Sequence, residues 1–413
     1  MNWHSKNRNS SSALTDFAIG LRTAGKTLCC RGWNRMSHTL RLSAKCSGAL
    51  FFFVVCACSG FAQSVPTSTC EPSFPLAQGW LGADIAYSIP LDGGRDLWIF
   101  GDTLYGSRRK VVDDDLRMVR NSSGISTCKD GRWNIDYTIR RDASGKRLDF
   151  FQSQHKDTWY WPLDGVVHNG DLWITLLCVR SSPRTSPKDL GFEVCGTDLA
   201  HVTGVHQGPQ DWKVLYLPLV PEMVHANPSA STVIDGDYLY LFAVDEHGKR
   251  PEILTRIPLA GLNHPSEYLQ YLDAGGLWQP GLEPAKAKAV MEHGAAEMTV
   301  RYHPELKKWI ALLVDPDIFS SKVLLRSSPS LTGPWTDGEV IYQIPELRKD
   351  SPEYDLDTYC YAGKEHPEFE GANELLFTYV CNTLKPQKLV KELNIYFPRI
   401  VRMRMPIQTA GPK

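Results

Sequence analysis

Three acidic residues stand in surroundings that make them chemically unusual. Asp84, Asp164 and Glu297 each lie inside an apolar stretch of sequence, where a charged side chain costs free energy unless it is paired. Carboxylates that come together repel one another, so the pKa of at least one should rise, which is the condition that a general acid needs. These three residues are therefore our candidates for acid–base catalysis.

Further polar residues recur at equivalent points of a repeating pattern, and we expect them to bind a substrate. Each directly follows or precedes an apolar run: Asp102, Arg180, Asn227, Asp245, Asp315 and Asn382. The competing explanation is that Asp and Asn simply mark the turns at which strands end.

Tryptophans stand next to two of the candidate acids. Trp80 precedes Asp84, and Trp159 and Trp161 precede Asp164. Flat rings beside carboxylates suit the apolar faces of sugar rings, so we predict that these tryptophans bind substrate. Packing between sheets explains them equally well, because aromatic side chains dominate buried area.

The elements that must position these residues form a repeat of strand, tight turn and strand. The second strands begin near residues 97, 172, 239, 309 and 375, at spacings of 75, 67, 70 and 66 residues. Asn-Gly and Asp-Gly turns, which are strong hairpin signals, join several of the pairs. The 32 glycines and 27 prolines, without long helical periodicity, favour an all-β chain.

Five similar intervals favour a five-bladed β-propeller over residues 75–406, rather than a pair of β-sandwiches. In a propeller the first strand of each blade lines the central axis, and the second strand runs back antiparallel. The starts of the first strands and the ends of the second strands therefore meet at one mouth. We expect this mouth to be rich in carboxylates.

The N-terminus has the order of a secretory signal peptide. Arg41 and Lys45 precede the apolar run Gly48–Cys58, and small residues follow at 60–62. The run is shorter than the roughly 20 residues that span a bilayer, and a buried helix is the alternative. We expect 1–62 to be an extension plus signal peptide, 63–74 a linker and 407–413 a tail. The first expectation is a secreted or periplasmic protein, and the second is a lipid on Cys58 that anchors it to the membrane.

Six cysteines follow the predicted leader, and an even number permits disulfides in an exported chain. Two pairs flank predicted turns, so each can meet across neighbouring strands. The remaining two cysteines form the third pair. The predicted disulfides are Cys360–Cys381, Cys178–Cys195 and Cys70–Cys128.

The charge balance after residue 62 bears on the partner. The first 62 residues hold 8 of the 45 basic and 1 of the 46 acidic residues, which leaves 37 basic against 45 acidic. A nucleic-acid groove needs clustered Lys and Arg, so we do not expect nucleic acid to be the partner. A hydrophobic content of 42% supports a folded core.

Several motifs resemble those of a known family. The segments Gly79–Gly106, Arg120–Gly124, Trp159–Leu172 and Tyr361–Glu368 resemble the bacterial domain-of-unknown-function family 4185. Ser328–Trp335 (SPSLTGPW) is similar to the blade motif of five-bladed glycoside hydrolases of the arabinanase and fructosidase type.

The resemblance implies roles for particular residues. Asp84 would be the base or nucleophile, Asp164 the aspartate that orients and tunes it, and Glu297 the acid, with Asp102 competing for the first role. Asn121, within Arg120–Gly124, is predicted to bind substrate. A calcium ion would lie near the fifth-blade histidine, His366, for which a plain turn residue is the alternative.

These observations favour an exported glycoside hydrolase that cuts a carbohydrate polymer with paired carboxylates. One alternative is a non-catalytic, carbohydrate-binding propeller on the cell surface. Another is a structural or protein-interaction propeller whose mouth is plugged by its own loops.

Overall fold

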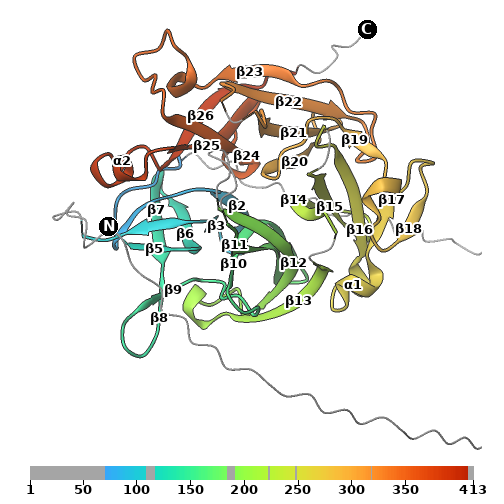
Figure 1. Cartoon of the computed structure of the whole chain (residues 1–413), viewed down its shortest axis with the longest axis horizontal. Helices are drawn as coiled ribbons and strands as arrows, with labels where there is room; N and C mark the ends of the chain where they lie inside the picture. The colour runs from blue at the N-terminus through green and yellow to red at the C-terminus, as the bar shows by residue number, and fades with distance from the viewer. Residues whose placement is uncertain are drawn as a thin grey trace, which may run out of the picture. The chain divides into compact units, whose positions relative to one another are not determined.

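The predicted hairpins become the inner strands of five antiparallel sheets. The computed structural model describes residues 70–107, 117–183, 191–221, 224–246, 249–317 and 319–407. In this part of the chain the sheets are arranged as blades in a ring about a central axis (Figure 1). The all-β, five-bladed propeller predicted from the repeat is confirmed.

Blades one, two and four each contain four strands in sequence order. Blade one consists of β2 (Tyr87–Leu91), β3 (Arg95–Phe100), β6 (Ser122–Lys129) and β7 (Arg132–Thr138). Blade two consists of β10 (Thr158–His168), β11 (Asp171–Ser181), β12 (Phe192–Thr203) and β13 (Lys213–Pro221). Blade four consists of β20 (Met298–His303), β21 (Lys308–Val314), β22 (Lys322–Ser328) and β23 (Glu339–Gln343).

Blade three has six strands and blade five has three. Blade three consists of β14 (Ala226–Asp235), β15 (Tyr238–Asp245), β16 (Glu252–Pro258), β17 (Gln270–Leu272), β18 (Trp278–Pro280) and β19 (Ala289–Met291). Blade five consists of β24 (Thr358–Glu365), β25 (Glu374–Thr383) and β26 (Pro398–Arg404).

Smaller elements join the blades. A three-stranded sheet, which the repeat did not predict, contains β1 (Trp80–Ala83), β4 (Thr103–Tyr105) and β5 (Arg117–Val119). The β8 (Arg140–Arg141) and β9 (Arg147–Leu148) strands pair with each other. The described helices are short: α1 (Pro265–Tyr268), α2 (Pro386–Lys391), η1 (Pro209–Asp211), η2 (Leu259–Gly261), η3 (Pro284–Lys286), η4 (Pro345–Leu347) and η5 (Pro367–Phe369). No described helix is long and apolar enough to cross a membrane.

Polar contacts between blades fasten the axis. The Tyr87 hydroxyl, on blade one, lies 2.6 Å from the carbonyl oxygen of Ala230 and 2.9 Å from that of Met298, on blades three and four. Tyr87 is fully buried. The inner strands are therefore held together by hydrogen bonds as well as by apolar packing.

Bulges interrupt three of the five inner strands at the same end of the axis. The pairing register shifts between Pro162 and Gly165 in β10, between Pro228 and Ser231 in β14, and between Tyr361 and Lys364 in β24. A bulge re-aims the side chains around it. In this protein the bulges let neighbouring residues of an inner strand face in different directions.

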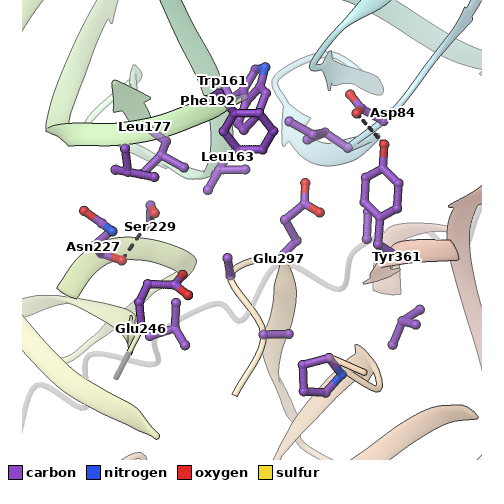
Figure 2. Close-up of a pocket in the computed structure, with 18 of the residues that line it drawn as sticks. Asp84, Trp161, Leu163, Leu177, Phe192, Asn227, Ser229, Glu246, Glu297 and Tyr361 are labelled. Carbon is purple, nitrogen blue, oxygen red and sulfur yellow. Dashed lines mark hydrogen bonds between the residues drawn. The ribbon is translucent and has the colours of Figure 1, made fainter. Parts of the chain in front are cut away.

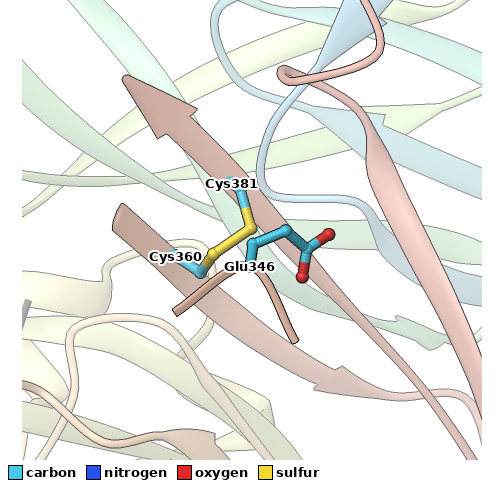
Figure 3. A group of neighbouring side chains, drawn as sticks. All are labelled: Glu346, Cys360 and Cys381. Carbon is cyan, nitrogen blue, oxygen red and sulfur yellow. A yellow bond between two sulfur atoms is a disulfide. The ribbon is translucent and has the colours of Figure 1, made fainter. Parts of the chain in front are cut away.

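The three predicted disulfides are confirmed as Cys70–Cys128, Cys178–Cys195 and Cys360–Cys381. Cys360 and Cys381 are direct cross-strand partners, and Glu346 lies beside them (Figure 3). Cys70 and Phe74 are buried, so this end of the predicted linker packs against the first blade. The predicted leader, Cys58 and the last six residues lie outside the described residues.

Candidate functional site

A cavity of about 1170 Å³ opens among residues from all five blades. It lies at the mouth where the inner strands begin and the second strands end, as the repeat predicted for the meeting of these segments. Eight of the sequence-predicted residues line it: Asp84, Asp102, Trp161, Arg180, Asn227, Glu297, Asp315 and Asn382. Their roles stay predictions, but the fold brings them together.

Asp84 sits on a strained turn at the edge of the cavity. The sequence suggested a strand from this residue onward, whereas β2 begins at Tyr87 because Ile85 and Ala86 have φ angles of +70° and +52°. This conformation costs free energy in residues other than glycine, and it is found preferentially at functional sites. A Cβ atom on Gly101 would come within 2.4 Å of the Asp84 Oδ1 atom, so glycine is required there.

Asp84 and Glu297 both point into the cavity (Figure 2). Burial raises the pKa of Asp84 well above its usual value, and the charges of Asp102 and Glu297 raise it further. Burial also raises the pKa of Glu297, against the opposing effect of Lys364. Two carboxyl groups that disfavour each other's ionisation hold a proton more readily than isolated ones.

Tyrosine hydroxyls act in the opposite direction on Asp84. The Tyr361 hydroxyl donates a hydrogen bond of 2.8 Å to Asp84 Oδ2, and Tyr396 also lowers the pKa of Asp84 by hydrogen bonding. The second carboxylate oxygen, Oδ1, is buried without a hydrogen-bond partner. Asp84 is thus held by tyrosine hydroxyls, while its Oδ1 atom is enclosed beside Gly101.

Lys364 lies fully buried beneath the same site. Burial lowers the pKa of its ammonium group to about 7, and the charges of Glu297 and Asp164 oppose this effect. Its Nζ atom lies 4.0 Å from the centre of the Tyr87 ring and has no hydrogen-bond partner. A buried amine with such a pKa places a titrating group next to Glu297.

One wall of the cavity is apolar and aromatic. Trp161 and Phe192 pack edge to face with ring centres 4.8 Å apart, beside Leu163 and Leu177 (Figure 2). The indole nitrogen of Trp161 donates a 3.1 Å hydrogen bond to Asp102 Oδ1. This wall has the flat apolar area and the polar edge that a sugar ring can use.

Asp102 is held in place, in contrast to Asp84. Its Oδ2 atom lies 3.2 Å from Nη1 of Arg120, a residue that the sequence reasoning did not select. Burial raises the pKa of Asp102, and Arg120 and Trp161 oppose that effect. With both oxygens engaged, Asp102 is a weaker candidate for the reacting base than Asp84.

Asp164 does not line the cavity, although the resemblance gave it a role there. It is fully buried, and both of its oxygens accept hydrogen bonds of 2.9 Å from the Arg301 guanidinium. Ser231 and the backbone of Thr232 donate to it as well. The β10 bulge turns Leu163 into the cavity and Asp164 into the axis, where it joins three blades.

Two tryptophans also lie away from the cavity. Trp80 is fully buried and stacks on Tyr137 at 4.5 Å, so it packs β1 against blade one. Trp159 lies under the Arg120 guanidinium at 4.3 Å. For both residues, packing accounts for the contacts observed.

Asn121 and Asp245 likewise do not line the cavity. Asn121 is buried, donates to the carbonyl oxygens of Phe151 and Tyr160, and accepts from the backbone of Phe151. It therefore joins blade one to the chain that enters blade two. Asp245 is the last residue of β15, and its backbone donates to Pro251.

The surroundings of His366 do not fit a calcium ion. Its Nδ1 atom is 2.5 Å from Ser88 Oγ and its Nε2 atom 2.9 Å from Thr378 Oγ1, so both ring nitrogens are engaged. Burial lowers the pKa of this imidazole well below its usual value. Calcium prefers six to eight oxygen ligands, and the contacts of His366 instead bind blade one to blade five.

Several residues of the site were not found from the sequence. They are Glu193, Glu246, Arg250, Tyr359, Tyr361, Lys364 and Tyr396. Tyr361 and Lys364 fall in the segment that carried the family resemblance, and this was the only signal for them. Tyr359 lies on the inner strand β24 but was not selected, and the others come from loops and an outer strand with no fixed phase in the repeat.

The fold and this carboxylate-lined mouth define a five-bladed propeller with a cavity at one end of its axis. The chain belongs to the family described as "Domain of unknown function (DUF5005)", whose model matches residues 73–404. That match does not confirm family 4185, the number suggested by the sequence motifs. A sequence search of curated proteins finds no match.

Solved structures share the fold at low sequence identity. A putative hydrolase from Bacteroides ovatus ATCC 8483 has a TM-score of 0.61 at 18% identity and covers 78% of this chain and 86% of its own. An α-L-arabinanase from Cellvibrio cellulosa scores 0.42 at 9% identity, with 78% and 91% covered. An endo-arabinanase from Bacillus licheniformis scores 0.41 at 13% identity, with 78% and 94% covered. The first of these likenesses supports the fold.

Proposed function

We propose that this protein is an exported glycoside hydrolase that cleaves a carbohydrate polymer in the cavity at the propeller mouth. The observation that carries the proposal is the pair Asp84 and Glu297, which point into one cavity and are both shifted toward the protonated state. Two carboxyl groups across a glycosidic bond are the usual machinery of its hydrolysis. Arabinanases are among the similar structures, which agrees with this class.

The two carboxyl groups take different parts in the proposed reaction. Asp84 acts as the base or nucleophile in its ionised form. Hydrogen bonds from Tyr361 and Tyr396 favour that form, against the larger effect of burial, which raises its pKa. Glu297 keeps its proton through burial and gives it to the leaving oxygen. Trp161 and Phe192 provide the apolar wall for the sugar.

Export and the carbohydrate partner belong to the same proposal. Three disulfides are typical of proteins that fold in an oxidising compartment. Together with the predicted leader, they favour a secreted or periplasmic protein. A lipid on Cys58 is the alternative that would keep it at the cell envelope.

The first test is a screen for reducing-sugar release from arabinans, fructans and bacterial cell-wall polysaccharides. We expect release from one of them, and loss of that release in Asp84→Asn. The exposed Asp157→Asn is the matched control and should be fully active. Binding of a polysaccharide without any release would instead indicate a carbohydrate-binding propeller.

The second test separates the acid from the base. A substrate with a good leaving group, such as a nitrophenyl glycoside, needs no proton from the enzyme. We expect Glu297→Gln to lose about 10²–10⁴-fold in kcat on the polymer but far less on the nitrophenyl glycoside. Asp84→Asn should lose activity on both substrates, and a fully active Glu297→Gln enzyme would remove Glu297 from the mechanism.

A further inference from the structure

A second group of ionisable side chains lies at the opposite end of the axis from the cavity. His303 is the last residue of β20, Glu365 is the last residue of β24, and Glu370 follows η5. The cavity is lined from the other ends of these strands, by Glu297 and Tyr361. The group therefore belongs to neither the cavity nor the proposed reaction.

The three side chains converge in the interior. Each offers one ligand atom, and these atoms lie within 4.8 Å of one another. The exposed fractions of His303, Glu365 and Glu370 are 5%, 1% and 8%. The His303 Nε2 atom is 2.7 Å from Glu365 Oε1. Two ligands that bind one ion tetrahedrally at about 2.1 Å lie about 3.4 Å apart, so the pair must lose the shared proton and separate by about 0.7 Å to accept an ion.

The outer contacts of the group are those that orient metal ligands. The other ring nitrogen of His303, Nδ1, is 3.0 Å from Glu305 Oε1, and a carboxylate in this position leaves Nε2 to face the ion. Glu370 Oε1 accepts a 2.8 Å hydrogen bond from the backbone of Leu376. Contacts outside the group therefore fix the orientation of both His303 and Glu370.

The charge of the group is only partly compensated: the imidazole of His303 pairs with Glu365 and Glu305, and one cation cannot offset all the carboxylates around it. The Oε2 atom of Glu365 is buried and has no hydrogen-bond partner. Burial and the charges of Glu365 and Glu368 raise the pKa of Glu370 to about 9, against the opposing effect of His303. The guanidinium of the nearby Arg301 donates its hydrogen bonds to Asp164 rather than to this group. A divalent cation among these carboxylates would bind the orphaned oxygen and offset the repulsion.

We propose that His303, Glu365 and Glu370 form a structural site for a divalent transition-metal ion of the zinc or manganese type, which joins blade four to blade five. An imidazole with carboxylates suits these ions, whereas calcium prefers oxygen ligands alone. The other described group with ligand types, Glu346 with Cys360 and Cys381, is excluded because both sulfurs are in a disulfide.

The test uses the full chain without a polyhistidine tag, stripped with EDTA and then titrated separately with ZnCl₂, MnCl₂ and CaCl₂. We expect one Zn²⁺ or Mn²⁺ per chain and weaker binding of Ca²⁺. A metal concentration about 100 times Kd should raise the melting temperature by about 4 °C.

Two variants assign the site. Glu365→Gln and Glu370→Gln should weaken binding by about 100-fold or more, and Glu339→Gln, at an exposed position of β23, should leave it unchanged. Glu370→Gln removes one charge from a crowded group, so it should fold in EDTA at least as well as the unmodified chain. Glu365→Gln also removes the ion-pair partner of the buried His303, so its unfolding midpoint in EDTA should fall. Absence of saturable Zn²⁺ and Mn²⁺ binding, or equal binding in all variants, would overturn the proposal.

Discussion

At the scale of single residues, the site depends on how differently two neighbouring aspartates are held. Asp102 has both oxygens engaged by Trp161 and Arg120, whereas Asp84 keeps one oxygen without a partner. The sequence favoured Asp84 because it lies inside an apolar stretch, although Asp102 competed with it for the same role. Hydrogen bonds donated by residues of other segments support Asp84 over Asp102.

Tyr361 should set the acid limb of the pH profile. Its hydrogen bond to Asp84 favours the ionised carboxylate, so Tyr361→Phe should raise the pKa of Asp84 still further. If Asp84 acts ionised, the limb of kcat/KM at low pH should move to higher pH, with kcat/KM at high pH much less affected. The measurement is the pH profile of polymer hydrolysis. A limb that stays in place would show that Tyr361 does not act through Asp84.

At the scale of elements, bulges and cross-links do the positioning. The bulges in β10, β14 and β24 let a strand place one side chain in the cavity and its neighbour in the axis. In β10 these neighbours are Leu163 and Asp164. An uninterrupted alternation of strand residues would not produce this arrangement.

The Cys70–Cys128 disulfide should hold the entering chain onto blade one. It spans 58 residues, and its loss frees a long loop in the unfolded state. We expect the double change Cys70→Ser and Cys128→Ser to lower the free energy of unfolding by about 2–5 kcal/mol. Urea unfolding with and without reductant measures this effect. An unchanged midpoint under oxidising conditions would show that packing around Phe74 suffices.

At the scale of the whole molecule, a buried ion pair lies where the blades meet. Asp164 and Arg301 come from blades two and four, and Ser231 of blade three bonds to the same carboxylate. Each of these three residues is more than 60 positions away from the other two in the sequence. This arrangement makes Asp164 a residue of the axis rather than of the cavity.

Asp164→Asn should therefore act mainly on stability. The change leaves the buried Arg301 without its counter-charge, so the free energy of unfolding should fall by about 3–5 kcal/mol. Asp157→Asn, at the exposed start of the same hairpin, is the control and should change it little. A variant that unfolds at the same urea concentration as the unmodified chain but loses activity would return Asp164 to the tuning role that the resemblance implied.

The repeat could be predicted from the sequence, and with it the five hairpins, the propeller and the three disulfides. Strand periodicity, Asn-Gly and Asp-Gly turns and cysteines across turns are local features, and each reports on residues close in the chain. The convergence of polar residues on one mouth followed from the repeat as well. Asp84, Glu297 and six other predicted residues line the cavity for this reason.

The three-dimensional structure was needed to show which of these residues face the cavity and which are buried in contacts between blades. Some residues that do not line the cavity have the same local sequence patterns as residues that do: Asp164, Trp80, Asn121 and His366. A one-residue bulge or a partner from another blade reverses where such a side chain points, and neither leaves a periodic signal. The ionisation of Asp84 and Glu297 likewise depends on burial and on charges from distant segments, which no short stretch of sequence specifies.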